Sequence, residues 1–337
     1  MRIALDAMGG DNAPGEIIQG GLLALQAYPQ IQLTLLGPEQ TLREALSGKA
    51  YDAARLTVVD APEVITTHEK PVMAIRKKRN SSLVVGMSML KARQVDAFIS
   101  AGSTGAVLAG GLFVTGRIPG ISRPALAMVY PSLKGPAMVI DIGANVDCKP
   151  QHLVQFAVMG SAYMKQVLGK DNPRVGLINN GAEAEKGNEL TKATYQALEQ
   201  APVNFTGNVE PREIMEGPAD VLVCDGFAGN IVLKLMEGMV GAIFTLLKGV
   251  FYKNLGTKLA AATLKGGLKE MKTQMDYTEY GGAPLLGVNG CVIKAHGSSK
   301  AKAICSAVKQ AIAYLDKDVT GLIADEVAKI DWEGKEA

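Results

Sequence analysis

Six short segments of the sequence each combine glycine with Asp, Asn, Ser or Thr, directly after a run of apolar residues. Glycine lets backbone N–H groups approach a ligand closely, and Ser, Thr and Asn can cap a following helix, whose N-terminus favours anions. One such segment is typical of an ordinary turn, but six in one chain favour a shared site for an oxyanion such as phosphate. The segments are residues 6–14, 100–105, 141–147, 179–181, 225–230 and 296–299.

A phosphate site in this chain needs local cations, because the formal net charge is only +2. Lys186 follows one predicted strand, while Lys294 and His296 lie at the end of another. Lys186 could equally be a solvated charge near the start of a helix. Asp6 and Asp11 are second candidates, since carboxylates beside glycines are often structural. The candidate phosphate ligands are Gly102, Ser103, Thr104, Gly105, Asn145, Asn180, Asn230, Lys294, Ser298 and Ser299.

Charge, cysteine spacing and absent motifs argue against several other classes of protein. The balanced charge disfavours nucleic-acid binding. The four cysteines form no C-x-x-C pair, which disfavours zinc and a disulfide framework and fits a reducing, cytoplasmic setting. No G-x-x-x-x-G-K-[ST] occurs, and no G-x-G-x-x-G follows a strand, so P-loop and dinucleotide sites are disfavoured. We therefore expect no metal and no cofactor.

Short apolar runs, polar clusters and longer segments with helical spacing alternate along the chain. This alternation predicts an α/β fold, an open and mostly parallel sheet with helices on both faces, as a single domain over residues 1–337. Loops at the carboxyl ends of parallel strands converge on one crevice, so all six segments should meet there. Residues 122–131 could add a strand at the sheet edge. Further strands are predicted at residues 2–5, 32–36, 56–59, 97–100, 137–140, 174–177, 221–223 and 292–294.

Two stretches depart from this pattern. Residues 97–116 contain no charge and could just span a bilayer, but their glycines, serines and threonines favour a buried strand, loop and helix. Residues 238–275 are rich in lysine, and their apolar residues recur at helical spacing. We expect this second stretch to be a basic amphipathic helical excursion from the sheet.

Five blocks of sequence together resemble a known family: MRIALDAMGGD at residues 1–11, SAGSTGA at 100–106, DIGANVD at 141–147, DGFAGN at 225–230 and KAHGSS at 294–299. They are similar to the PlsX family, the bacterial phosphate acyltransferases of phospholipid synthesis, also called acyl-acyl-carrier-protein:phosphate transacylases. The likeness covers nearly the whole chain.

The resemblance implies transfer of a fatty acyl group from acyl-acyl-carrier-protein to inorganic phosphate, giving acyl phosphate for a membrane glycerol-3-phosphate acyltransferase. It also implies a fold related to phosphotransacetylases and to isocitrate and isopropylmalate dehydrogenases. A homodimer and a cytoplasmic protein in peripheral contact with the membrane are further implications. Residues 238–275 are the natural candidate for that contact, and a dimer-interface helix pair is an equally open interpretation.

The implied chemistry leads to a mechanistic expectation. Phosphate is anionic at neutral pH, so we expect it to attack the thioester directly once it is positioned, with no acyl-enzyme. Lys186 and His296 would supply positive charge or protonate the departing thiolate, and Asp225 would orient one of them. Cys224 could instead accept the acyl group, although a cysteine packed into the core is the more ordinary interpretation.

Three other functions remain open at this point. A CoA-dependent phosphotransacylase would use the same chemistry with a smaller acyl donor. An NAD-dependent decarboxylating dehydrogenase would share the fold, but the dinucleotide motif is absent. A non-catalytic membrane adaptor could use residues 238–275 alone, but it would not need six polar loops.

Overall fold

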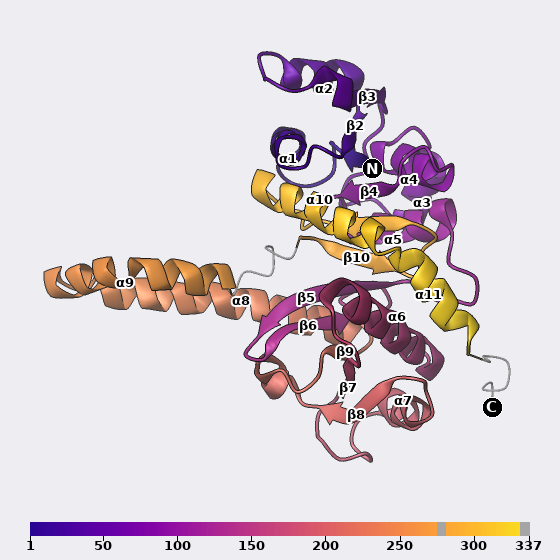
Figure 1. Cartoon of the computed structure of the whole chain (residues 1–337), viewed down its shortest axis with the longest axis vertical. Helices are drawn as coiled ribbons and strands as arrows, with labels where there is room; N and C mark the ends of the chain where they lie inside the picture. Colours follow the sequence, from indigo (N-terminus) through magenta and orange to yellow (C-terminus); the bar gives the residue numbers. More distant parts are fainter. Residues whose placement is uncertain (275–280, 331–337) are drawn as a thin grey trace.

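A computed structural model describes residues 1–274 and 281–330 (Figure 1). Its strands form one 11-stranded sheet in the order β3-β2-β1-β4-β11-β10-β5-β6-β9-β7-β8. The strands are β1 (Arg2–Asp6), β2 (Gln32–Gly37), β3 (Leu56–Asp60), β4 (Ala97–Ser100), β5 (Ala125–Ser132), β6 (Gly135–Ile140), β7 (Arg174–Ile178), β8 (Asn204–Val209), β9 (Val221–Val223), β10 (Ala283–Leu286) and β11 (Cys291–Lys294).

Helices connect most of the strands. The α-helices are α1 (Gly15–Ala27), α2 (Glu39–Leu46), α3 (Pro71–Lys77), α4 (Ser82–Lys91), α5 (Thr104–Gly110), α6 (Pro150–Leu168), α7 (Glu189–Glu199), α8 (Gly226–Phe251), α9 (Leu255–Gln274), α10 (Ala301–Asp316) and α11 (Val319–Ala328). Three short helical segments complete the described chain: η1 (Ala53–Arg55), η2 (Gly111–Thr115) and η3 (Pro211–Glu216).

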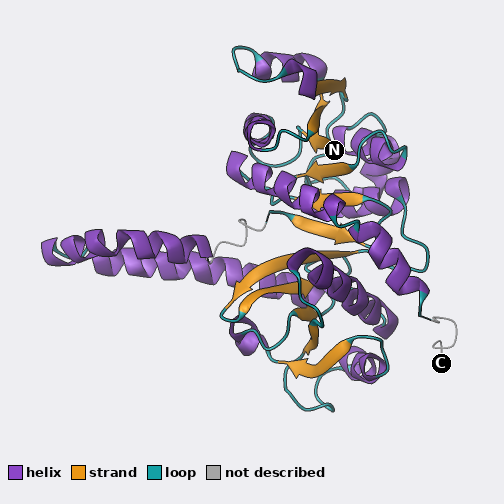
Figure 2. Cartoon of the chain, in the orientation of Figure 1, coloured by secondary structure: helices purple, strands orange, loops and turns teal. Residues whose placement is uncertain are grey.

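The sheet is covered on both faces, because successive strand residues point into two different hydrophobic cores. Ile3 and Leu5 of β1 belong to one core, which includes residues of α1, α6, α10 and α11. Ala4, between them, belongs to the other, which includes residues of α4 and α5. Figure 2 shows the strands lying between these helices. Three of the ten strand pairings in the described chain are antiparallel and the rest parallel, which confirms the predicted α/β fold with a mostly parallel sheet.

The two halves of the sheet run in opposite directions. β1, β2, β3, β4 and β11 are mutually parallel, and so are β6, β7, β8 and β9. The antiparallel pairs β11·β10, β10·β5 and β5·β6 join the two sets. Lys294, at the carboxyl end of β11, pairs with Ala283 of β10. Ile140, at the carboxyl end of β6, pairs with Ala127 of β5. The carboxyl ends of the half-sheets therefore face a common region between them.

Several details differ from the sequence-based predictions. Residues 122–131 were expected at the sheet edge, but β5 lies in the middle, paired with β10 and β6, so the edge prediction is wrong. The sequence did not predict β8, where glycine and polar residues interrupt the apolar pattern, or the short β10. Residues 97–116 form β4, a loop, α5 and η2, as predicted.

Helices α8 and α9 form a long hairpin that projects from the body of the molecule (Figure 1). The sequence placed this excursion at residues 238–275. The helix begins earlier, at Gly226, because the Asp225 carboxylate caps its first turn. Residue 275 lies outside the described residues, and α9 ends at Gln274. The early start matters because the first turns of α8 belong to the body of the protein, and only the later turns belong to the projecting hairpin.

Candidate active site

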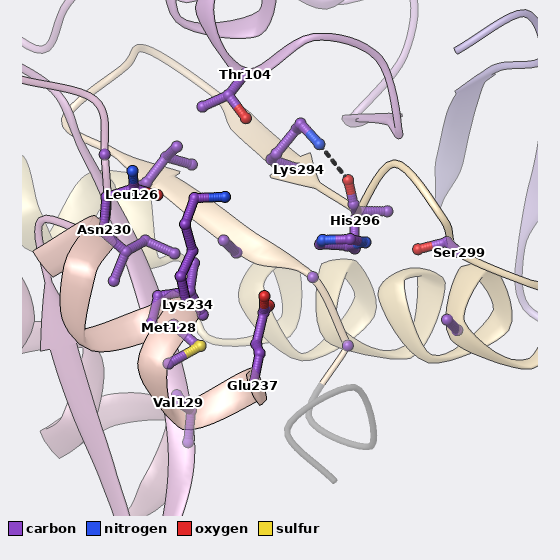
Figure 3. Close-up of a pocket in the computed structure, with 18 residues that line it drawn as sticks. Thr104, Leu126, Met128, Val129, Asn230, Lys234, Glu237, Lys294, His296 and Ser299 are labelled. Carbon is purple, nitrogen blue, oxygen red and sulfur yellow. Dashed lines mark hydrogen bonds between the residues drawn. The ribbon is translucent and has the colours of Figure 1, made fainter. Parts of the chain in front are cut away.

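A cavity of about 340 Å³ lies between the two half-sheets (Figure 3). Part of its wall is apolar and comes mainly from Leu126 and Met128 of β5 and Leu233 of α8. The polar residues Thr104, Lys294, His296 and Ser299 line the other side, and Asn230 of α8 lies beside Leu126 (Figure 3). The sequence singled out all five of these polar residues. Groups that can bind an anion thus share one cavity with a wall that can hold hydrocarbon.

Lys294, the last residue of β11, is the buried cation of the cavity. Only 8% of its surface is exposed, and its ammonium group donates a hydrogen bond to the carbonyl oxygen of Ala295. Burial lowers the pKa of Lys294 to about 8, although the nearby carboxylates of Asp11 and Asp6 act in the opposite direction. The lysine is therefore still mainly protonated at neutral pH, in a position where its charge is poorly solvated.

The loop after β1 packs against the loop that follows β11 and Lys294. The buried Asp6 carboxylate accepts hydrogen bonds from the Ser100 hydroxyl at 2.6 Å and from the Met8 N–H at 3.2 Å, and burial raises its pKa. The Asp11 N–H donates to the carbonyl of Gly297 at 2.8 Å. Gly10 has a φ of +99°, and a Cβ there would lie 2.9 Å from that same carbonyl oxygen. The β1 loop thus holds the β11 loop in place, and neither Asp6 nor Asp11 is among the residues that line the cavity.

His296 is oriented by its own loop. Its Nδ1 accepts a hydrogen bond from the Ser298 N–H at 3.2 Å and lies 2.8 Å from the Ser298 hydroxyl oxygen. This arrangement leaves the proton of the neutral ring on Nε2. The Asn12 side chain fixes the loop further by donating to the carbonyls of Ser298 and Ser299. Ser298 therefore serves to position His296, whereas the buried Ser299 lines the cavity.

The start of α8 is tied to the loop after β6. Asp225 accepts a hydrogen bond from the Ala228 N–H at 2.7 Å, which is the bond of a helix cap. The Gly226 N–H donates to the carbonyl of Asn145 at 2.7 Å. The Asn145 amide is itself buried and donates to Pro124 and Asp141. Asp225 and Asn145 thus place the first turns of α8, and Asn230 with them, against the cavity.

Asp141 and Cys224 lie beneath these loops. Asp141 accepts hydrogen bonds from the N–H groups of Gly143, Ala144, Asn145 and Leu126, and its burial raises its pKa to about 6. Cys224 is only 2% exposed, and burial raises the pKa of its thiol well above the ordinary value. A buried thiol that resists ionisation is a poor nucleophile, so these contacts favour the structural interpretation of Cys224.

Comparison with known proteins assigns the chain to a family. Residues 1–322 match the model of a family described as fatty acid synthesis protein. The chain belongs to this family. A phosphate acyltransferase of Clostridium perfringens (strain SM101) is 50% identical over 336 residues, which cover 99% of each chain. A phosphate acyltransferase of Thermoanaerobacter pseudethanolicus is 52% identical over 333 residues, again 99% of each chain.

Solved structures share the fold of this fatty acid synthesis protein. A phosphotransacetylase from Streptococcus pyogenes superimposes with a TM-score of 0.62 at 17% identity, covering 94% of both chains. The EutD phosphotransacetylase from Staphylococcus aureus gives a TM-score of 0.57 at 16% identity, covering 97% of this chain and 94% of that one. The predicted relation to the phosphotransacetylase fold is thereby confirmed.

Other predicted site residues of this family member lie outside the lining of the cavity. Lys186 and Asn180, in the loop after β7, are exposed and take part in backbone hydrogen bonds with Glu183 and Asn179. Gly102, Ser103 and Gly105 belong to the turn into α5, where only Thr104 reaches the lining. Five of the six polar segments thus form or support the cavity, and none of the described residues of the β7 loop lines it. The catalytic roles of Lys186 and Asp225 stay predictions.

Sequence reasoning missed two charged residues that line the cavity, Lys234 and Glu237. With Asn230 they recur at intervals of four and three residues, so they lie on one face of α8. That spacing was visible in the sequence. Neither residue was singled out, because the predicted basic excursion covers residues 238–275 and leaves out both side chains.

Proposed function

We propose that this protein is a phosphate acyltransferase that moves a fatty acyl group from acyl-acyl-carrier-protein to inorganic phosphate. Relatives at about 50% identity over the full chain carry the name phosphate acyltransferase. The observation that carries the proposal is the composition of the cavity, where a buried lysine, hydroxyls and an amide share the lining with apolar side chains. The polar side suits phosphate, and the apolar wall suits the first carbons of an acyl chain.

Phosphate binds in this proposal between the loops after β4 and β11. Lys294 provides charge, and the hydroxyls of Thr104 and Ser299 donate hydrogen bonds from either side. The Asn230 amide donates from α8. Charge-assisted hydrogen bonds of this kind are about twice as strong as neutral ones, and low polarity around Lys294 strengthens its attraction for an anion.

The reaction is a direct displacement at the thioester carbonyl. A phosphate oxygen forms a bond to the carbonyl carbon, the carbon–sulfur bond breaks, and the proton of hydrogenphosphate ends on the departing sulfur. In its imidazolium form, His296 can donate its Nε2 proton to the thiolate, and the neutral ring can then recover a proton from the phosphate. Positioning two reactants side by side supplies most of the required acceleration, since well-aligned groups behave as if they were present at very high concentration.

The test is to incubate the purified protein with inorganic phosphate and palmitoyl-acyl-carrier-protein and to trap the product with hydroxylamine. We expect acyl hydroxamate only when phosphate is present. Palmitoyl-CoA in place of the carrier protein separates the alternative, a CoA-dependent phosphotransacylase. Equal or greater turnover with the CoA ester would contradict the proposed donor, and no phosphate-dependent product from either donor would contradict the whole proposal.

The α8–α9 hairpin is proposed to mediate self-association and membrane contact. Length and composition alone would allow α8 to cross a bilayer, and little of it is buried. Leu255 and Leu259 near the hairpin tip are 79% and 72% exposed, and lysines such as Lys258 lie beside them. Apolar residues flanked by cations suit the surface of an anionic membrane. We therefore propose a cytoplasmic homodimer that touches the membrane and delivers acyl phosphate to a glycerol-3-phosphate acyltransferase there.

Vesicle flotation and size-exclusion chromatography test these two roles of the hairpin separately. The double variant Leu255→Glu, Leu259→Glu should lose flotation with anionic vesicles. If it remains a dimer, the tip serves the membrane; if it becomes monomeric, the tip serves the dimer. A folded dimer that floats as well as the wild type would contradict membrane contact through this tip.

A further inference from the structure

Lys234 and Glu237 on α8 have no role in the proposed reaction so far, although both line the cavity. Figure 3 shows the two side chains rising from the same helix toward Lys294 and His296 on the opposite side. Lys234 and Glu237 lie on α8, which follows β9 of one half-sheet, whereas Lys294 and His296 belong to β11 of the other half-sheet and to the loop after it. The cavity is thus lined by charged groups from both halves of the sheet.

The Glu237 carboxylate is incompletely paired. Its Oε1 atom is buried but has no hydrogen-bond partner in the part of the chain that the structure describes. An acceptor left unsatisfied in this way destabilises the empty site. A carboxylate oxygen can only accept hydrogen bonds, so the group that satisfies it must carry a proton.

We propose that the Glu237 carboxylate accepts a hydrogen bond from the P–OH group of hydrogenphosphate while Lys234 and Lys294 neutralise the charge of the anion, so that the cavity selects phosphate and rejects sulfate. Inorganic phosphate keeps at least one P–OH group throughout the neutral pH range, and sulfate carries none. A sulfate ion in the same position would bring an unprotonated oxygen against the unpaired carboxylate. This inference rests on the proposed function, since it assigns the selection of the phosphate substrate to the same cavity.

The arrangement also explains why an acidic residue can belong to an anion site. The two lysines supply charge without discrimination, because an ammonium group attracts any oxyanion. The negative charge of Glu237 lowers the affinity of the cavity for every anion. Only a protonated anion can offset this repulsion, by donating a hydrogen bond to the carboxylate. Sites that are built to hydrogen-bond a particular group reject analogues that lack it, by factors of about 10⁴ in well-packed cases.

Equilibrium binding of phosphate and sulfate, each titrated alone and measured by calorimetry, tests the proposal without turnover. Wild-type protein should prefer phosphate by about 100-fold or more, and Glu237→Gln should reduce this preference to within about fivefold. The glutamine amide can donate to sulfate, so sulfate should bind more tightly to the variant while phosphate binds more weakly. Glu237→Asp keeps the carboxylate and should keep a preference for phosphate. Lys234→Met should weaken both anions by a similar factor.

Glu199→Gln is the matched control, because it removes the same charge from an exposed position at the end of α7. It should bind both anions as the wild type does. A Glu237→Gln protein that melts normally and retains the wild-type preference would overturn the proposal, as would a wild-type protein without any preference. Selective phosphate binding without acyl phosphate formation would instead overturn the proposed function and leave this inference standing.

Discussion

Replacing Lys294 with methionine should stabilise the protein and weaken its binding of phosphate. Methionine has a similar length and no charge, so it can fill the same buried space. Burial lowers the pKa of Lys294 from 10.5 to about 8, and a difference of that size corresponds to about 3 kcal/mol. The folded protein therefore carries the lysine charge at neutral pH at a cost that the unfolded chain does not have.

The size of this effect on stability depends on pH. Below about pH 8 both states hold the proton, and the folded state bears the full cost of the buried charge. Between about pH 8 and 10.5 the unfolded chain keeps a proton that the folded protein has released, so the contribution of Lys294 to stability rises with pH. Lys294→Met should thus exceed the wild type in free energy of unfolding by up to about 3 kcal/mol at pH 7, and the difference should shrink toward pH 10.5.

Phosphate affinity should move in the opposite direction. One pair of unit charges about 4 Å apart is worth about 4 kcal/mol at an effective dielectric constant near 20. Loss of the Lys294 charge should therefore raise the KM for phosphate by about 100-fold or more. Urea unfolding at pH 7 and pH 9.5, together with the phosphate dependence of acyl phosphate formation, measures both quantities.

Lys192→Met is the control for charge removal, because Lys192 is exposed on α7. Its stability and phosphate KM should match those of the wild type. The reasoning would be refuted by a Lys294→Met protein that is less stable at pH 7 and still uses phosphate with the wild-type KM. That combination would mean that the lysine stabilises the fold through its contacts and faces no substrate anion.

Four further substitutions test the assignment of roles in and around the cavity. His296→Ala should lower kcat by about 10²-fold or more, because it removes the acid. Lys186→Ala should leave kcat within about twofold, since Lys186 lies outside the cavity lining. Steady-state kinetics of the two variants would show the contrast. Cys224→Ala should retain turnover, because the Cys224 thiol is buried and resists ionisation. Intact-protein mass spectrometry of the wild type during the reaction should show no acylated enzyme. An acyl adduct on Cys224 would contradict direct attack by phosphate. Gly229→Ala should destabilise the protein by about 2 kcal/mol or more, because the added Cβ would lie 1.8 Å from the Asp141 carbonyl oxygen. Thermal melting would detect this loss of stability. An unchanged melting temperature would contradict the close contact between Gly229 and Asp141.

The sequence predicted the elements of the fold better than their connections. Runs such as residues 2–5 and 137–140 are apolar throughout, as expected for strands buried on both faces, and both are strands. Their relative direction could not be read from the sequence. It depends on β10 and β5, which pair antiparallel in the centre, and β10 offers only four residues without any distinctive alternation.

The sequence predicted the parts of the candidate site that lie in glycine-rich loops after strands. It predicted less well the parts formed by residue types that have many other roles in proteins. Glycine-rich loops after strands identified the neighbourhoods of Thr104, Asn230 and His296, which line the cavity. Lys186 met the same criteria, but its strand lies beyond β9, farther from the centre of the sheet. Lys234 and Glu237 escaped notice because an exposed lysine and a glutamate on a long helix usually form a solvated face.

The opposed directions of the two half-sheets account for the composition of the site. In a wholly parallel sheet, every polar loop would lie along one edge, and the apolar strands would be covered by helices. Here β5 and β10 cross the middle of the sheet, so their apolar side chains border the same cavity as the polar loops that follow β4, β6 and β11. Neither half alone brings Lys294 together with the face of α8 that carries Asn230. The antiparallel centre of the sheet is therefore what allows one cavity to take both an anion and an acyl chain.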